Sequence, residues 1–150
     1  MKKQTVRDIE VNGKRVLVRV DFNVDMRDGR IADEGRIRAV LPTILYLQER
    51  EARIVLCSHL GRPGGKVVEE LRLAPVGHRL AEITGQRVHI AQDCIGPQVE
   101  AAVAKLKPGE ILLLENLRFH PGEEKNDPEF ARALASLAEV FVNDGFAVAH

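Results

Sequence analysis

Residues 53–63 read RIVLCSHLGRP, an apolar run that stops abruptly at a polar loop punctuated by Gly and Pro. A short, continuous apolar run of this kind suits a strand covered on both faces, as in a parallel sheet. His59 and Arg62 follow at the point where the strand ends. In open parallel sheets, ligands bind outside the carboxyl ends of the strands. The stretch therefore predicts a parallel sheet with a ligand site at that edge.

The same pattern recurs along the chain, with apolar runs separated by helical periodicity. The expected strands, besides Arg53–Cys57, are Val16–Val20, Val88–Ile90, Ile111–Leu114 and Val140–Val142. Apolar stripes and end signals predict helices around Ile37–Leu45 and over Leu73–Thr84, Pro97–Leu106 and Asp127–Glu139.

Two local features qualify this alternation. Pro42 falls inside the first helical stripe and is expected to kink it, because proline removes one backbone hydrogen bond. Asp25–Glu34 contains Asp28-Gly29, which predicts a turn or small hairpin. Strands that alternate with helices imply right-handed βαβ units. The expected fold is therefore α/β, a three-layer α/β/α sandwich with a Rossmann-like parallel sheet of five visible strands.

Composition limits the possible partners. The chain has 150 residues, with 22 Lys plus Arg, 22 Asp plus Glu and only 4% aromatic residues. A balanced charge and few aromatics disfavour nucleic acid as a partner. No apolar run approaches the ~20 residues of a membrane span, and the first residues lack the apolar core of a signal peptide. We expect a cytoplasmic protein, with Cys57 a buried and inert thiol.

Polar residues after three of the strands are candidates for binding a small anion. Asp21 and Asn23 follow the first strand, and Arg118 follows the fourth in ENLRF. Arg36, with Arg38, lies in the first turn of the first helix, where the helix dipole disfavours a cation. Arginine matches carboxylate and phosphate in a bidentate way, so several on one edge suit a ligand that bears both groups.

Each candidate also has a purely structural interpretation. Asp21 and Asn23 could form a turn that leaves the strand, and the loop after Arg53–Cys57 could simply be solvated. Carboxylates just upstream could balance Arg36 and Arg38, and Glu115 could pair with Arg118. The charged GEEKND run before Pro128 is most simply a solvated approach to a helix. We expect core or surface positions, not metal ligation, for His78, His89 and His120.

The loop SHLGRPGGK is not a Walker phosphate loop. Gly65-Lys66 is followed by Val67, and Leu60 occupies the place of the first glycine. The chain also lacks a G-x-G-x-x-G fingerprint. A stand-alone nucleotide-binding fold is therefore disfavoured.

Four motifs in order, RVDFNV, SHLGRP, ENLRFHPGEE and the final FVNDGFAVAH, closely resemble the N-terminal domain of phosphoglycerate kinase. The resemblance covers essentially the whole chain. It implies a six-stranded first domain that binds 3-phosphoglycerate and a second domain that binds Mg-ATP or Mg-ADP. Residues 1–150 would then be an incomplete N-terminal domain, without the sixth strand and without the nucleotide domain. Asp25 departs from the family, which usually has proline there.

The resemblance also implies roles for the candidate residues. Its substrate contacts correspond to Asp21, Asn23, Arg36, His59, Arg62 and Arg118, with Arg36 nearest the transferring group. The implied reaction is reversible phosphoryl transfer between 1,3-bisphosphoglycerate and ADP, giving 3-phosphoglycerate and ATP. Magnesium would arrive with the nucleotide on the missing domain, so no metal ligands are expected here. The full-length enzyme would be a monomer, and this chain alone would be inactive.

The alternative from another class is a non-catalytic binding module. It predicts an uncovered sheet edge that pairs with another chain, because unpaired edges template association.

Overall fold

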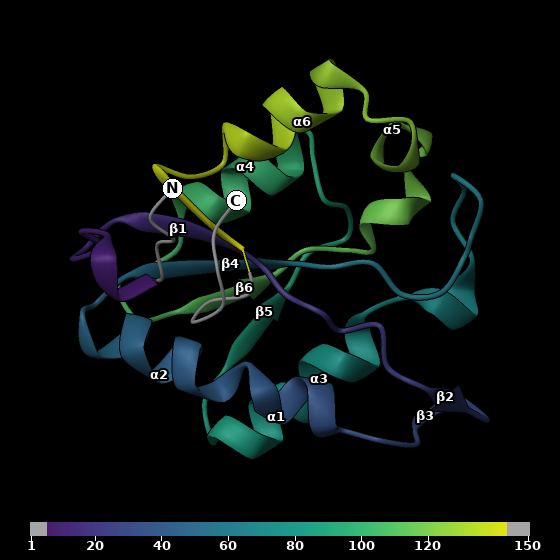
Figure 1. Ribbon diagram of the computed structural model, residues 1–150, viewed down its shortest axis with the longest axis horizontal. Helices are drawn as coiled ribbons and strands as arrows, with labels where there is room; N and C mark the ends of the chain where they lie inside the picture. The colour runs from purple at the N-terminus through teal and green to yellow at the C-terminus, as the bar shows by residue number, and fades with distance from the viewer. Residues whose placement is uncertain (1–5, 144–150) are drawn as a thin grey trace.

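The computed structural model describes residues 6–143, and its centre is a parallel sheet (Figure 1). Five strands pair in the order β5-β6-β4-β1-β7, and every pair is parallel. Their carboxyl ends therefore meet at one edge. The strands are β1 (Arg15–Arg19), β4 (Arg53–Cys57), β5 (Val88–Ile90), β6 (Ile111–Leu113) and β7 (Val140–Asn143).

Helices cover both faces of the sheet, which confirms the three-layer sandwich (Figure 1). One face carries α1 (Gly35–Ala39), α2 (Leu41–Glu49) and α3 (Ala74–Thr84), and the other carries α4 (Pro97–Ala104) and α6 (Pro128–Ala135). The short helix α5 (Pro121–Glu124) precedes α6. Three single-turn helices complete the fold: η1 (Val6–Asp8), η2 (Glu69–Leu71) and η3 (Leu117–Phe119).

The alternation of side chains along each strand divides the core in two. Val16 and Val18 pack with the α1–α3 side, whereas Leu17 packs with the α4–α6 side. Ile54 and Leu112 repeat this division on β4 and β6. All five side chains are at most 2% exposed. Burial on both faces explains why these strands are continuous apolar runs, and the sheet edge remains the place for polar groups.

The first helical stripe differs from the expectation of one kinked helix. It is two helices, α1 and α2, separated at Val40. Pro42 lies in the first turn of α2, where its missing N–H has no intrahelical acceptor to lose. Breaking the helix there therefore costs less than carrying proline in its interior. The separate α1 places Arg36 close to the end of β1.

The other helices and strands match the expectations closely, although some helices are shorter than predicted. α4 and α6 stop at Ala104 and Ala135, before the predicted ends. Strand ends differ from the expected ones by at most one residue. The expected hairpin is confirmed: β2 (Met26–Arg27) pairs antiparallel with β3 (Arg30–Ile31). Both turn residues between them, Asp28 and Gly29, have positive φ, at 52° and 74°, as a two-residue primed turn requires.

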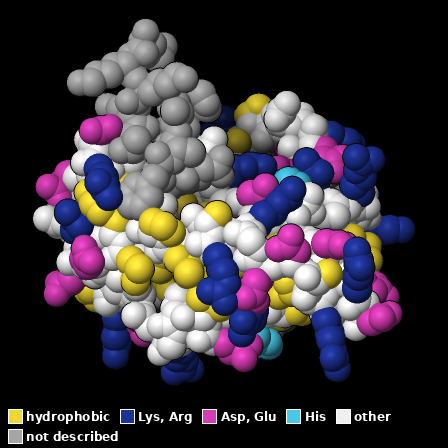
Figure 2. Space-filling model, turned by 60° about the horizontal axis from the view of Figure 1, so that its bottom comes forward, with side chains coloured by type: hydrophobic (Ala, Val, Ile, Leu, Met, Phe, Trp, Pro, Cys, Tyr) yellow, Lys and Arg dark blue, Asp and Glu magenta, His cyan; other side chains and the backbone are white. Residues whose placement is uncertain are grey.

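The surface mixes charges of both signs. In the face drawn in Figure 2, Lys and Arg side chains are interspersed with Asp and Glu, and a group of hydrophobic side chains lies to the left. Cys57 is fully buried, as predicted, and burial raises the pKa of its thiol to about 12. Within residues 6–143, no helix is both long and apolar enough to cross a membrane.

Candidate functional site

Arg36 reaches from α1 to the polar segment that follows β1. Its Nη1 donates to the Asp21 carboxylate at 3.1 Å and to the Asn23 carbonyl oxygen at 2.6 Å. The Asn23 amide N–H donates to the same Asp21 carboxylate at 3.1 Å. The turn expected at Asp21 and Asn23 is therefore present, and it holds the guanidinium. The structural interpretation, a turn, and the functional one, a polar site, therefore hold together for these residues.

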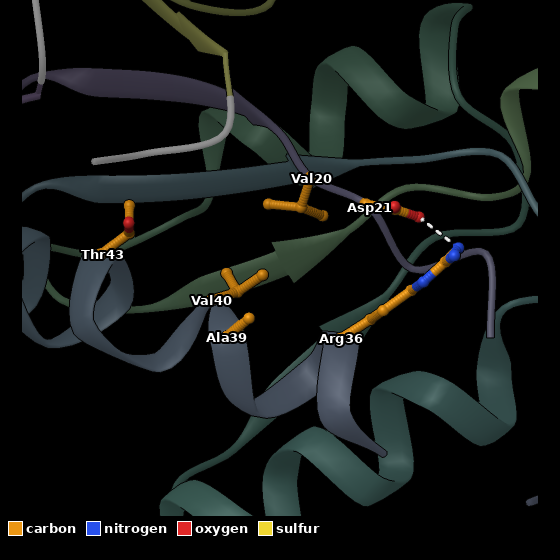
Figure 3. Close-up of a pocket in the computed structure, with 6 residues that line it drawn as sticks. All are labelled: Val20, Asp21, Arg36, Ala39, Val40 and Thr43. Carbon is orange, nitrogen blue, oxygen red and sulfur yellow. Dashed lines mark hydrogen bonds and ion pairs between the residues drawn. The ribbon is translucent and has the colours of Figure 1, made fainter. Parts of the chain in front are cut away.

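A pocket of about 220 Å³ lies beside this ion pair. Figure 3 shows Asp21 and Arg36 pointing toward one another at its mouth, with Val20, Val40 and Thr43 along the wall. The side chains of Arg36 and Asp21 are 54% and 58% exposed. A ligand can therefore reach both groups directly.

The neighbouring cation, Arg38, is engaged elsewhere. Its guanidinium bonds to Glu34 at 2.7 Å, and Arg79 of α3 bonds to the same carboxylate at 2.6 Å. These hydrogen bonds, first that of Arg79 and then that of Arg38, lower the pKa of Glu34 to about 2. The upstream carboxylate therefore balances Arg38, as the structural interpretation expected. Arg36 does not share this carboxylate, and its guanidinium contacts the carboxyl edge of the sheet instead.

Two asparagine side chains, the half-buried Asn23 and the buried Asn116, fix the loop after β4. The Asn23 side-chain oxygen accepts from the Gly61 N–H at 2.9 Å. Asn116, fully buried after β6, donates to the Leu60 carbonyl at 2.8 Å and accepts from the Leu60 N–H at 3.2 Å. It also accepts from the Arg118 N–H at 3.0 Å. Loops from three strands are thus joined into one frame.

Arg62 and Arg118 line a second, open pocket of about 630 Å³, together with Gly64, Glu123 and Glu124. The Gly65 N–H donates to the Arg118 carbonyl at 3.1 Å, which holds the two segments together. Among residues 6–143, the exposed Arg62 side chain makes no hydrogen bond or ion pair. Arg118 Nε is buried and also lacks a hydrogen-bond acceptor in this part of the chain. The pocket therefore offers two arginine side chains whose donors are not all used, with the carboxylates of Glu123 and Glu124 beside them.

His59 is half-buried and close enough to Asp21 and Arg118 for both charges to act on its ring. Burial, followed by the charges of Arg118 and Arg19, lowers the pKa of its imidazole, and Asp21 opposes that shift. The shift favours the neutral form of the ring. The neutral ring can still donate one N–H to an anion, and a bound anion would favour its protonation.

Two sequence interpretations of nearby carboxylates are wrong. Glu115 is 5% exposed and bonds to Arg72 at 3.0 Å and to the Leu73 N–H at 2.9 Å, not to Arg118. The GEEKND run is not merely a solvated approach, since Glu123 bonds to Arg19 of β1 at 2.5 Å. Neither link is local, so helix or turn signals could not reveal them.

The six candidate residues share one edge of the sheet but not one cavity. Asp21 and Arg36 line the pocket of Figure 3, and Arg36 also lines another pocket, of about 340 Å³, with Asn23. Arg62 and Arg118 line the larger open pocket. Asn116 was not anticipated as a site residue, although it stands inside the ENLRF motif. The signal available in the sequence was its place just after the apolar run Ile111–Leu114.

Taken together, the parallel sheet and its basic carboxyl edge define an open α/β domain of the kind that binds ligands outside its strand ends. The chain belongs to the phosphoglycerate kinase family. The model of that family, described as phosphoglycerate kinase, matches residues 6–150.

Individual relatives agree with this assignment. The chain is 65% identical over 150 residues to phosphoglycerate kinase of Moorella thermoacetica and 57% identical to that of Pelotomaculum thermopropionicum. In both cases 100% of this chain aligns with 38% of the relative, so it spans well under half of their length.

Solved structures give the same result for the fold. Phosphoglycerate kinase from Coxiella burnetii superposes with a TM-score of 0.84 at 37% identity, covering 99% of this chain and 37% of that one. The enzyme from Pyrococcus horikoshii OT3 gives 0.82 at 34% identity, covering 95% and 36%. The Rossmann-like α/β prediction is thereby confirmed. The final motif of the sequence, from Asp144 onward, lies outside the described residues.

Proposed function

We propose that this chain is the N-terminal, 3-phosphoglycerate-binding domain of a phosphoglycerate kinase. The longer protein would transfer a phosphoryl group reversibly between 1,3-bisphosphoglycerate and ADP in the cytoplasm, as a monomer. The observation that carries the proposal is that two arginines line one open pocket: Arg62, which makes no ion pair within residues 6–143, and Arg118, whose Nε lacks a hydrogen bond and lies 3.6 Å from Glu124. A phosphate group supplies several strong acceptors, and charge-assisted hydrogen bonds contribute about 1.5–3 kcal/mol each.

We assign the two ends of the ligand to the two groups of residues. Arg62, Arg118 and the neutral ring of His59 would hold the 3-phosphate. Asp21 and Asn23 would fix the hydroxyl-bearing end, with Arg36 nearest the carboxyl group that exchanges the phosphoryl. Because Arg36 already contacts Asp21, the ligand would enter an existing hydrogen-bonded frame. Such preorganisation lowers the cost of orienting the reacting group.

The chemistry needs little from this chain beyond positioning and charge. When 3-phosphoglycerate is the acceptor, its attacking carboxylate is already ionised, so no general base is required. Arg36 would neutralise charge that develops on the transferring group. Within residues 6–143, Ser58 Oγ donates to the backbone carbonyl of His59 and not to a histidine ring.

We infer that the Mg-nucleotide binds outside the described edge. Mg²⁺ prefers carboxylate oxygens, and three carboxylates here are occupied by arginines: Asp21 by Arg36, Glu115 by Arg72 and Glu123 by Arg19. The nucleotide and its metal would bind the remainder of the longer protein. We therefore expect the chain alone to form no ATP, because transfer requires both substrates in one closed cleft.

An NMR titration of the chain with 3-phosphoglycerate, and separately with ATP, tests the proposal. We expect shifts at Asn23, Arg36, Arg62 and Arg118 with 3-phosphoglycerate and none with ATP. Arg118→Ala should abolish the shifts around Arg62, whereas Arg132→Ala, an exposed arginine of α6, should not. A folded sample that shows no shifts with 3-phosphoglycerate would refute the assignment of this edge.

A second candidate function, binding of another protein, is favoured by one observation. Phe141 of β7, the last strand of the described sheet, is 48% exposed. It lines a groove of about 340 Å³ with Leu17, Phe130 and Leu134. Light scattering at high concentration tests this candidate: a concentration-dependent increase in mass supports it, and a constant monomer mass counts against it.

A further inference from the structure

Asp93, Cys94 and His120 bring three different donor atoms together at a place that the proposed substrate site does not use. One ligand atom of each, a carboxylate oxygen, a thiol sulfur and a ring nitrogen, lies within 4.8 Å of the other two. The first two residues follow β5, whereas His120 precedes α5, so the cluster joins two loops that are distant in sequence. Spacing along the chain gave no sign of it.

We propose that these three side chains form a binding site for a borderline-soft divalent cation, with Zn²⁺ the best match. Histidine nitrogen, cysteine sulfur and carboxylate oxygen are the donors that zinc takes in proteins. Calcium and magnesium are excluded by the same chemistry, because they select oxygen donors. The proposal is independent of the phosphoryl-transfer function.

The geometry requires only a small contraction. Zinc bonds of about 2.0–2.3 Å in a tetrahedron place donor atoms roughly 3.3–3.8 Å apart. The widest pair would therefore close by about 1 Å, and the hydrogen bond between His120 Nε2 and Asp93, now 2.6 Å, would open. The side chains of His120 and Asp93 are 30% and 50% exposed, so both have room to turn. A water molecule from that exposed side can supply the fourth ligand.

The surroundings already orient the donors. The Cys94 N–H donates to the Asp93 carboxylate at 2.7 Å, and the Asp93 carbonyl accepts from the Glu115 N–H at 3.2 Å. The His120 ring packs against Phe130, with 5.4 Å between ring centroids. Cys94 is fully buried, so its sulfur approaches the site from the protein side only. Contacts of this kind support metal ligands from outside the coordination sphere.

A simpler explanation is a structural Asp93–His120 hydrogen bond beside an inert core thiol. The two explanations differ in one respect: only a metal site brings sulfur into the same interaction. A thiolate ligand has a specific signature, a sulfur-to-cobalt charge-transfer band when Co²⁺ replaces Zn²⁺.

The test is a titration of the chelator-treated chain with Co²⁺ alone, followed by displacement with Zn²⁺. We expect one cobalt per chain, a thiolate charge-transfer band and a higher melting temperature with Zn²⁺. Cys94→Ala should abolish the band, and His120→Gln should weaken binding at least about tenfold, since even loss of an outer-shell partner costs that much.

Matched controls exist within the same chain. Cys57→Ala removes the other buried cysteine, and His89→Gln removes a histidine that likewise contacts a carboxylate, Glu110, at 3.4 Å. Both variants should retain the band and the affinity. No band in the unmodified chain, or a band that survives Cys94→Ala, would overturn the proposal. His120→Gln, a change at a partly exposed position, keeps the test decisive if Cys94→Ala does not fold.

Discussion

The Glu124 carboxylate of α5 lies 3.6 Å from Arg118 Nε, close enough to attract the guanidinium but too far to accept a hydrogen bond from it. Glu124 lines the same open pocket as Arg62. The pocket that we assign to phosphate therefore already holds a carboxylate that competes for the arginine. An incoming anion must displace it or share the cation with it.

Glu124→Gln should tighten anion binding. Removing a half-exposed competing charge is worth about 0.2–1 kcal/mol, which corresponds to roughly a 1.4- to fivefold gain in affinity for 3-phosphoglycerate. Calorimetry or NMR titration at low salt would measure it. Glu100→Gln, the same charge change on α4, is the control. An equal gain there would attribute the effect to net charge instead of to the pocket.

Arg36→Ala should weaken 3-phosphoglycerate binding by roughly 10- to 150-fold, the loss of one charge-assisted interaction of about 1.5–3 kcal/mol. Stability should fall by less than about 1 kcal/mol, because the Arg36–Asp21 pair is exposed. Arg38→Ala is the matched control. Arg38 lies in the same helix but pairs with Glu34, so its loss should leave the affinity for 3-phosphoglycerate unchanged. Equal losses of affinity in the two variants would attribute the effect to α1 as a whole and not to a contact of Arg36 with the ligand.

His59 should respond to the ligand by changing its pKa. In the free chain the pKa of the ring is lowered, chiefly by burial. A bound anion favours the charged form, so NMR titration should show the pKa rising on saturation with 3-phosphoglycerate. Affinity should accordingly strengthen as the pH falls through neutrality, more in the native chain than in His59→Gln. An unchanged pKa in the saturated complex would place the phosphate elsewhere.

The same shift has a consequence for stability. Because the folded-state pKa lies below the unfolded value, the native state binds fewer protons than the unfolded state in that range. The contribution of His59 to the free energy of unfolding is therefore fully present at pH values above 6.5, the ordinary pKa of histidine. It declines as the pH falls toward the folded-state pKa. Urea unfolding midpoints of the native chain and His59→Gln should diverge accordingly between neutral and mildly acidic pH.

Asn116→Ala should destabilise the fold by about 2–4 kcal/mol. The side chain makes four hydrogen bonds, to both backbone groups of Leu60, to the Leu71 carbonyl and to the Arg118 N–H. Its removal leaves buried groups unpaired, at about 1–3 kcal/mol for each that water cannot reach. Urea denaturation measures this, with the exposed Gln92→Ala as control. A loss below 1 kcal/mol would show that water replaces the amide.

The strands were predictable because burial on both faces makes each one a continuous apolar run. Such a run can be identified in the sequence without knowing which strands it pairs with. The helix break at Val40 was not, because Pro42 is compatible with either a kink or a new first turn. Arg36 could be named as a candidate, but its contact with Asp21 depends on where α1 lies over β1. The Asp93–His120 contact spans 27 residues and two loops, which no periodicity encodes.

The place of β1 between β4 and β7 has a consequence for how the chain folds. β1 is made first, yet its partner on one side, β7, ends at Asn143. During synthesis, the edge of β1 that pairs with β7 stays unpaired while more than a hundred residues are added. Closing so long a loop has a high entropic cost and is slow. We therefore expect a nascent chain that stops short of β7 to stay dependent on chaperones or to aggregate through that edge.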